Sequence, residues 1–312
     1  MGNRDIFRLY ESCALCPREC GVNRNQGELG YCRASGQSVA VGTICAHHGE
    51  EPVISGSGGI CNVFFMHCNL QCSFCQNVQI SHNQSPLINH TDSILNVSRR
   101  ITHLLDQGCR AIGFVSPTHY LPHMIAIIET IRESGYRVPV VYNTNAYDKP
   151  EVLRILEGYV DIYLPDFKYG IAETGCLLSE ADDYPDVALK AIKEMYRQKG
   201  STLIIDEYGQ AVSGLIIRHL VLPGNVTNSI KVLEMIAGEL SVKVNISLMS
   251  QYNPLYYKLN DPAMQRVLTP EEYDKVKDAF SNLGFYRGWI QELNSFGFYN
   301  PDFSSDTPFR EV

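Results

Sequence analysis

The chain has 312 residues, 45% of them hydrophobic, and a formal net charge of -8 from 34 acidic and 26 basic side chains. This length allows one large core or two domains, and the acidic balance argues against a general affinity for nucleic acid or anionic membranes. The sequence has no uninterrupted apolar stretch of about 18 residues and no signal-peptide core, so we expect a cytoplasmic protein without a membrane segment.

Residues 1–55 form a segment rich in cysteine, glycine and arginine, without clear periodicity. Nine of the 11 cysteines precede residue 76, and their odd count favours reduced thiols that bind metals over disulfides. Four of these cysteines have the spacing Cys13-x2-Cys16-x3-Cys20-x11-Cys32. The segment is too small for a core of its own, so we expect a metal-binding unit, with zinc favoured and a second iron-sulfur cluster as the alternative.

From residue 56 to 284, short β-branched runs alternate with amphipathic stretches, which is typical of βα units around a parallel sheet. Strands are predicted at 61–67, 111–116, 138–143, 160–164, 215–222 and 244–249, and helices at 92–107, 122–134, 150–157, 185–199, 226–240 and 270–283. Thr269-Pro270-Glu271-Glu272 gives the last helix a capping box. The predicted fold class is α/β, a partial (β/α)6 barrel, with an aromatic tail at 285–312 packed on it.

Three more cysteines follow the first predicted strand directly, in the order Cys68-Asn-Leu-Gln-Cys72-Ser-Phe-Cys75. Three thiolates on one tight loop can hold three irons of a four-iron cluster and leave the fourth iron open. The alternatives are buried, metal-free thiols, or zinc with His82 as a fourth ligand. A cluster that only carries electrons would normally have four cysteine ligands, so an electron-carrier protein is the weaker interpretation.

The spacing C-x3-C-x-aromatic-C, with Phe74 before the last cysteine, resembles the signature of the radical S-adenosylmethionine (radical SAM) superfamily. More narrowly, the chain is similar to the pyruvate formate-lyase activating enzyme-like proteins. This similarity extends from Cys13 to the final helix, through motifs that include His48-Gly-Glu-Glu-Pro52, Ser116-Pro-Thr-His-Tyr120, Asp166-Phe-Lys168 and Arg218-His-Leu-Val-Leu-Pro-Gly224.

The resemblance implies a [4Fe-4S] cluster on Cys68, Cys72 and Cys75, with S-adenosylmethionine bound to the open iron. One-electron reduction, by a partner such as flavodoxin or ferredoxin, would cleave S-adenosylmethionine to a 5'-deoxyadenosyl radical that abstracts hydrogen under anaerobic conditions. The implied target is a glycine of a glycyl radical enzyme. A small molecule or another protein side chain is the alternative target, and a nucleic-acid substrate is not expected.

Residues that follow the other predicted strands complete the expected site. Where the superfamily carries Gly-Gly-Glu, this chain has Thr118 and His119, which we offer as substitutes or as structural residues. The resemblance implies that Lys168 reaches the carboxylate or ribose of S-adenosylmethionine and that Asp166 organises that end of the barrel. Arg218 in an apolar strand needs an anion, either the S-adenosylmethionine carboxylate or one of Asp161 and Asp166. The further candidates are Phe74 and Asn145 as cofactor-binding residues, Asn143 in place of a cation-binding carboxylate, and Gln251 and Tyr252 by position.

Overall fold

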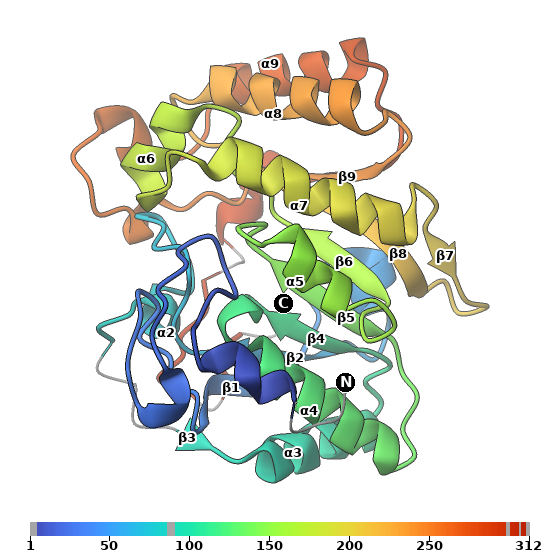
Figure 1. Ribbon diagram of the computed structural model, residues 1–312. Helices are drawn as coiled ribbons and strands as arrows, with labels where there is room; N and C mark the ends of the chain where they lie inside the picture. The colour runs from blue at the N-terminus through green and yellow to red at the C-terminus, as the bar shows by residue number, and fades with distance from the viewer. Residues whose placement is uncertain (1–4, 86–90, 298–299, 306, 310–312) are drawn as a thin grey trace.

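The computed structural model describes residues 5–85, 91–297, 300–305 and 307–309 (Figure 1). Its sheet has the order β10-β9-β8-β6-β5-β4-β2-β1-β3, with β7 paired to β8. The strands are β1 (Val39–His47), β2 (Ile60–Phe65), β3 (Thr91–Asp92), β4 (Ile112–Val115), β5 (Val140–Thr144), β6 (Ile162–Pro165), β7 (Ile204–Ile205), β8 (Ala211–Leu220), β9 (Asn245–Met249) and β10 (Gly288–Ile290).

Helices cover one face of this sheet (Figure 1). The α-helices are α1 (Pro52–Ser55), α2 (Val78–Ser81), α3 (Ile94–Asp106), α4 (Leu121–Glu133), α5 (Pro150–Ile155), α6 (Ala172–Ser179), α7 (Tyr184–Lys199), α8 (Val226–Glu239) and α9 (Pro270–Asn282). Short 3-10 helices occur at η1 (Ile6–Tyr10), η2 (Arg24–Gln26), η3 (Thr118–Tyr120), η4 (Pro254–Tyr256), η5 (Pro262–Gln265) and η6 (Leu293–Gly297).

The parallel strands β2, β4, β5, β6, β8 and β9 are the six predicted from the sequence, and they pair in chain order. Their apolar runs are buried on both faces, as expected for parallel strands that helices cover. The predicted fold class, a partial (β/α)6 barrel, is therefore confirmed. The capping box at Thr269 and Glu272 is also present, at the start of α9.

Two further segments extend this parallel core. β1, from the cysteine-rich part of the chain, pairs antiparallel with β2, so the barrel sheet continues into the segment 1–55. At the other edge β10, from the tail, pairs parallel with β9. The rings of Phe303 and Phe309 in the tail lie 5.5 and 5.2 Å from that of Phe64 in β2. Met1–Arg4 and several tail positions lie outside the described residues, and the predicted division into domains stays a prediction.

Alternating residues of the strands face opposite sides of the sheet. Tyr163 belongs to the large core between sheet and helices, whereas Ile162 and Leu164 join Ile60 and Val141 in a smaller apolar cluster. Because Ile60 and Ile162 begin their strands, this smaller cluster closes the barrel interior at the amino ends of the strands. The interior is left open toward their carboxyl ends, where catalytic residues gather in such barrels.

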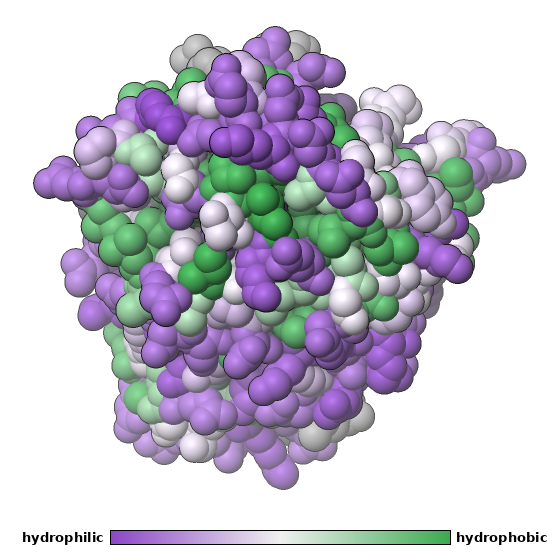
Figure 2. All heavy atoms as spheres, turned by 90° about the horizontal axis from the view of Figure 1, so that it is seen from above, coloured by the Kyte–Doolittle hydropathy of each residue, from purple (hydrophilic) through white to green (hydrophobic). Residues whose placement is uncertain are grey.

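The outer surface is mostly hydrophilic, with hydrophobic residues gathered across the middle of the face seen from above (Figure 2). Among the residues that the structure describes, none of the helices has the length and apolar character that a membrane crossing needs.

Candidate active site

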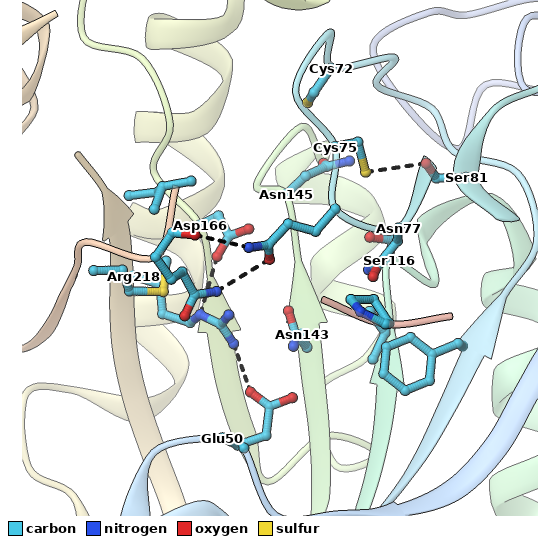
Figure 3. A pocket seen from close by; sticks show the side chains of 18 of the residues that line it. Glu50, Cys72, Cys75, Asn77, Ser81, Ser116, Asn143, Asn145, Asp166 and Arg218 are labelled. Atoms are coloured by element: carbon cyan, nitrogen blue, oxygen red, sulfur yellow. Dashed lines mark hydrogen bonds and ion pairs between the residues drawn. The ribbon is translucent and has the colours of Figure 1, made fainter. Parts of the chain in front are cut away.

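A pocket of about 360 Å³ lies at the carboxyl ends of the parallel strands. This volume is within the range of sites for small molecules. Figure 3 shows that its side chains converge from the loop after β2 and from the ends of β4, β5, β6 and β8. The lining includes Cys68, Cys72, Cys75, Phe74, Ser116, Asn143, Asn145, Asp166, Lys168, Arg218 and Gln251.

All three predicted cluster ligands face this pocket from one loop. The Cys68 sulfur accepts hydrogen bonds from Asn145 Nδ2 and from the Leu70 N–H, each at 3.4 Å. The Ser81 hydroxyl donates to the Cys75 sulfur at 3.2 Å (Figure 3). Burial raises the pKa of the Cys68 and Cys75 thiols, so their thiolates need a positive partner such as iron.

The donor atoms of this loop decide which metal group it could hold. Among the described residues, no three His, Cys, Asp or Glu side chains are arranged to hold a single metal ion, and His82 does not line the pocket. In a cubane cluster each thiolate binds a different iron, so its ligands stand further apart than those of one ion. Three thiols on one loop, hydrogen-bond donors to their sulfurs and open pocket space beside them fit a four-iron cluster.

A network of five charged side chains forms the wall opposite the cysteine loop. Arg218 Nη1 lies 2.8 Å from Glu50 Oε2, and Arg218 Nε lies 3.3 Å from Asp166 Oδ1 and 3.9 Å from Glu51 Oε1. Lys168 Nζ lies 2.7 Å from Asp166 Oδ2. Three carboxyl groups thus face two cations in the pocket wall.

For Asp166 and Lys168, the attraction between opposite charges outweighs the cost of burying them. Burial opposes the charge on Asp166, but Lys168 and Arg218 lower its pKa below the usual range. Burial also opposes the charge on Lys168, yet Asp166 and Cys72 raise the pKa of its ammonium. Glu51 is different, because burial dominates and raises the pKa of its carboxyl despite Arg218.

Several polar atoms of the pocket wall still lack hydrogen bonds. Asp166 Oδ1, Arg218 Nε and Glu51 Oε2 are buried and have no hydrogen-bond partner within the part of the chain that the structure describes. Unsatisfied buried polar atoms are costly. Such atoms at a pocket wall are suited to a ligand that brings both an ammonium and a carboxylate, as the methionine part of S-adenosylmethionine does.

The structure decides which aspartate lies beside Arg218. Its partners are Asp166 and the two glutamates of the His48-Gly-Glu-Glu-Pro52 motif, whereas the Asp161 carboxylate accepts the Val140 N–H instead. Glu50 is held by Asn62 Nδ2 at 2.9 Å, and Gly113 leaves the space that this asparagine occupies. Sequence reasoning assigned the two glutamates no role. The sequence did contain a signal for them, because an arginine in an apolar strand, such as Arg218, needs a carboxylate partner.

Asn145 and Gln251 have clear places in the site. The Asn145 side chain bonds to the Cys68 sulfur and to Asn69, so it holds the cluster loop in position. The Gln251 side chain donates to Gln76 Oε1, and the Gln76 side chain donates to the backbone carbonyl of Gln251. Gln76 directly follows Cys75. Ser116 lines the pocket with a left-handed φ of 49°, a conformation that non-glycine residues rarely adopt outside functional or strained positions.

Three expected residues do not line the pocket. The hydroxyl of Thr118 donates to Asp148 at 2.6 Å, and His119 Nε2 lies 2.7 Å from the Met66 carbonyl oxygen. The left-handed turn at Ser116 directs the chain into η3, away from the pocket, so neither residue substitutes there for Gly-Gly-Glu. Tyr252 is buried and donates its hydroxyl hydrogen bond to Met264.

Cys13, Cys16, Cys20 and Cys32 line a second, small cavity together with Arg24 and His119. The structure thus brings these four cysteines together, as the spacing predicted. No three of them are arranged for a single metal ion, so the expected zinc finds no support in their geometry.

Comparison with known proteins gives one relative in sequence. No protein-family model matches the chain. Uncharacterized protein MJ0674 of Methanocaldococcus jannaschii is 33% identical over 275 residues, which are 86% of this chain and 74% of that protein.

Among solved structures, Streptococcus suis SuiB bound to precursor peptide SuiA has a TM-score of 0.50 at 14% identity, over 74% of this chain. Native anSMEcpe with bound AdoMet also has a TM-score of 0.50 at 14% identity, over 77% of this chain. The chain spans 48% of the SuiB chain and 62% of the anSMEcpe chain. These structures share the partial-barrel fold of this protein. By its sequence, the chain belongs to the same protein family as the Methanocaldococcus jannaschii protein.

Proposed function

We propose that this protein is a radical SAM enzyme that holds a four-iron cluster through Cys68, Cys72 and Cys75. The cluster, when bound and reduced by one electron, supplies the reductive cleavage of S-adenosylmethionine to methionine and a 5'-deoxyadenosyl radical, which abstracts hydrogen from a substrate. The observation that carries the proposal is the placement of three thiols from one loop opposite a charged wall in one pocket.

The remaining residues of the pocket would bind and orient S-adenosylmethionine. Lys168 supplies a cation for the carboxylate or ribose, and Asp166 holds that ammonium in place at 2.7 Å. Glu50, Glu51 and Asp166 are the carboxyl groups of the pocket lining that would pair with the methionine ammonium in place of the missing Gly-Gly-Glu. Phe74, buried beside Cys75, limits water at the cluster loop. AdoMet bound in a structure of the same fold supports S-adenosylmethionine as the ligand of this pocket.

The target of the radical is a narrower proposal. The sequence resemblance makes a glycine of a glycyl radical enzyme the first candidate, with flavodoxin or ferredoxin as the reductant. A small molecule or another protein side chain is the alternative, and the precursor peptide bound to SuiB supports a peptide as one such substrate.

The test of the chemistry is the formation of 5'-deoxyadenosine. The protein would be purified anaerobically, reconstituted with iron and sulfide, reduced with dithionite and incubated with S-adenosylmethionine. We expect product from the wild type and from Cys176→Ala, which changes an exposed cysteine, and none from Cys72→Ala. The proposal would be overturned if the protein contained its full iron and sulfide but neither formed 5'-deoxyadenosine nor bound S-adenosylmethionine measurably.

The target needs a second experiment. Each glycyl radical enzyme of the host would be mixed with the reduced, S-adenosylmethionine-loaded protein and examined by electron paramagnetic resonance. A glycyl radical signal that requires Cys72 identifies the partner. If none of these enzymes gave a glycyl radical signal while 5'-deoxyadenosine was still formed, the target would instead be a small molecule or another protein side chain.

A further inference from the structure

The four cysteines of the N-terminal segment form a second thiol cluster, separate from the active site. Cys13, Cys16 and Cys32 are buried and Cys20 is half-buried, and all four line one cavity. The chain reaches this arrangement through a short hairpin, in which Cys13 and the segment at Gly21 and Val22 exchange backbone hydrogen bonds. Cys13 and Cys32 also join the large hydrophobic core, but four thiols from one short segment around one cavity are the arrangement of a metal centre.

Each of these sulfurs also faces an N–H group. The Tyr31 N–H donates to the Cys20 sulfur at 3.2 Å, and Arg24 Nη1 donates to the Cys13 sulfur at 3.9 Å. The backbone N–H groups of Arg18 and Ala34 interact with Cys16 and Cys32. Donors directed at every sulfur suit thiolates that are bound to metal, because such hydrogen bonds stabilise the negative charge on the ligands.

Arg24 is the independent observation that points to an anion at this site. The Arg24 residue is 1% exposed, and its guanidinium stacks on the Tyr10 ring at 4.0 Å. Its acceptors are the backbone carbonyls of Ala34, Ser35 and His119 and the Cys13 sulfur, and no described carboxylate pairs with it. A buried cation without a counterion is strongly destabilising. Among the described residues, the ionisable groups whose charge acts on Arg24 are the Tyr10 phenol, whose pKa burial raises, and the thiols of Cys13 and Cys32. Cys13 and Cys32, as thiolates, are therefore the counterions that this site offers.

We propose that Cys13, Cys16, Cys20 and Cys32 hold a second four-iron cluster, with Arg24 as its buried counter-cation. A cluster fits better than zinc because no three of these thiols are arranged for one ion, which is also true of the loop Cys68 to Cys75. Four protein ligands leave no iron open, so this second cluster does not bind S-adenosylmethionine.

The second cluster would also support the active-site loop. Arg18, which lies between Cys16 and Cys20 in sequence, donates from Nε to the carbonyl oxygen of Asn69 at 3.2 Å. Asn69 directly follows Cys68 and borders the N-terminal cavity. The N-terminal unit, once folded around its cluster, therefore holds the first cysteine of the active-site loop.

The experiment counts metal in variants that lack one site each. The triple variant Cys68→Ala, Cys72→Ala, Cys75→Ala removes the active-site ligands, and Cys16→Ser, Cys32→Ser removes the N-terminal pair. After anaerobic reconstitution, iron, acid-labile sulfide and zinc per chain would be measured, with Cys176→Ser as the control. We expect about eight irons in the wild type and control and about four in each variant.

The triple variant keeps the test decisive even if the N-terminal variant does not fold. Its remaining cluster should give an electron paramagnetic resonance signal, after reduction, that S-adenosylmethionine does not change. Replacing Arg24 with Gln in this background should make the reduction potential more negative, because a nearby positive charge stabilises the reduced cluster. No iron in the triple variant, or one zinc in place of iron, would overturn the proposal, whatever the outcome of the 5'-deoxyadenosine assay.

Discussion

Arg218 is the residue on which the charged wall of the pocket depends. It touches three carboxylates within 4 Å, from the chain before β2 and from the end of β6. Burial of a cation is tolerated here because the carboxylates accompany it, and their own burial is tolerated because of the cation. Removal of one member therefore affects all of them.

We expect Arg218→Met to lower the free energy of unfolding by about 3–5 kcal/mol at pH 7, the usual cost of an unpaired buried charge. The loss should shrink as the pH falls toward 4, because protonated carboxyl groups no longer need the cation. Urea unfolding at several pH values measures both effects. The control is Arg154→Met, whose side chain is 59% exposed and whose loss should cost less than about 1 kcal/mol. Equal effects of the two substitutions would contradict the buried network.

Lys168 lies in the same pocket wall, where we propose that it contacts S-adenosylmethionine. Loss of a charge-assisted hydrogen bond to a ligand costs about 1.5–3 kcal/mol, which corresponds to a factor of about 10 to 150 in affinity. We expect Lys168→Gln to raise the Kd for S-adenosylmethionine by that factor, in calorimetry under anaerobic conditions. Lys193→Gln, in the exposed pair with Glu239, should leave the Kd unchanged. An unchanged Kd in Lys168→Gln would remove this residue from the binding site.

At the scale of elements, α9 shows how a local sequence signal also makes a tertiary contact. The Thr269 hydroxyl accepts the Glu272 N–H, and the Glu272 carboxylate accepts the Thr269 N–H. The same carboxylate accepts the N–H of Gly224, in the turn between β8 and α8, and pairs with Arg266 at 2.7 Å. One side chain thus caps a helix and joins it to the neighbouring βα unit.

The hydrogen bonds from Arg266, with help from backbone N–H groups, lower the pKa of Glu272 from 4.5 to about 2. A lowered pKa in the folded state gives stability that is complete above pH 4.5 and lost as the pH falls toward 2. We expect Glu272→Gln to lower the free energy of unfolding by about 1 kcal/mol at pH 7, and the difference from wild type to shrink below pH 4.5. Chemical denaturation across this pH range measures this difference. The control is Glu271→Gln, at an exposed position, whose difference from wild type should not change with pH.

At the scale of the whole molecule, the tail closes the open side of the barrel. β10 adds to β9, and Pro301 and Phe309 contribute to the pocket wall. This docking depends on Gly288, which has a φ of 117° and whose Cβ, if present, would meet the backbone of Ile246. The chain can lie this close to β9 only without a side chain at that position.

We expect Gly288→Ala to detach β10 and expose Trp289, the only tryptophan of the chain, which lines the pocket. The fluorescence emission should shift to longer wavelength, and limited proteolysis should remove the tail faster than in the wild type. Gly238→Ala, at an open position of α8, should leave both unchanged and stabilise the helix by about 1 kcal/mol. Unchanged emission in Gly288→Ala would show that the tail docks without this close approach.

Most of the barrel was predictable because its signals are local. The apolar runs, the glycine and proline positions and the capping box at Thr269 predict six strands and six helices, and all are present. α6 was missed, since Gly175 and its short length give it a weak helical signal. The pairing of β1 with β2 was also missed, because strand pairing depends on contacts between distant residues.

The sequence by itself determined the three-cysteine loop, the order of the βα units and the grouping of the N-terminal cysteines, because spacing along the chain limits where their side chains can lie. Only the tertiary structure decided which carboxylates meet Arg218 and that Thr118 and His119 turn away from the pocket. It also decided that Arg24 is buried among thiols without a carboxylate. These contacts join residues far apart in the chain, and their geometry follows from packing, which no local pattern encodes.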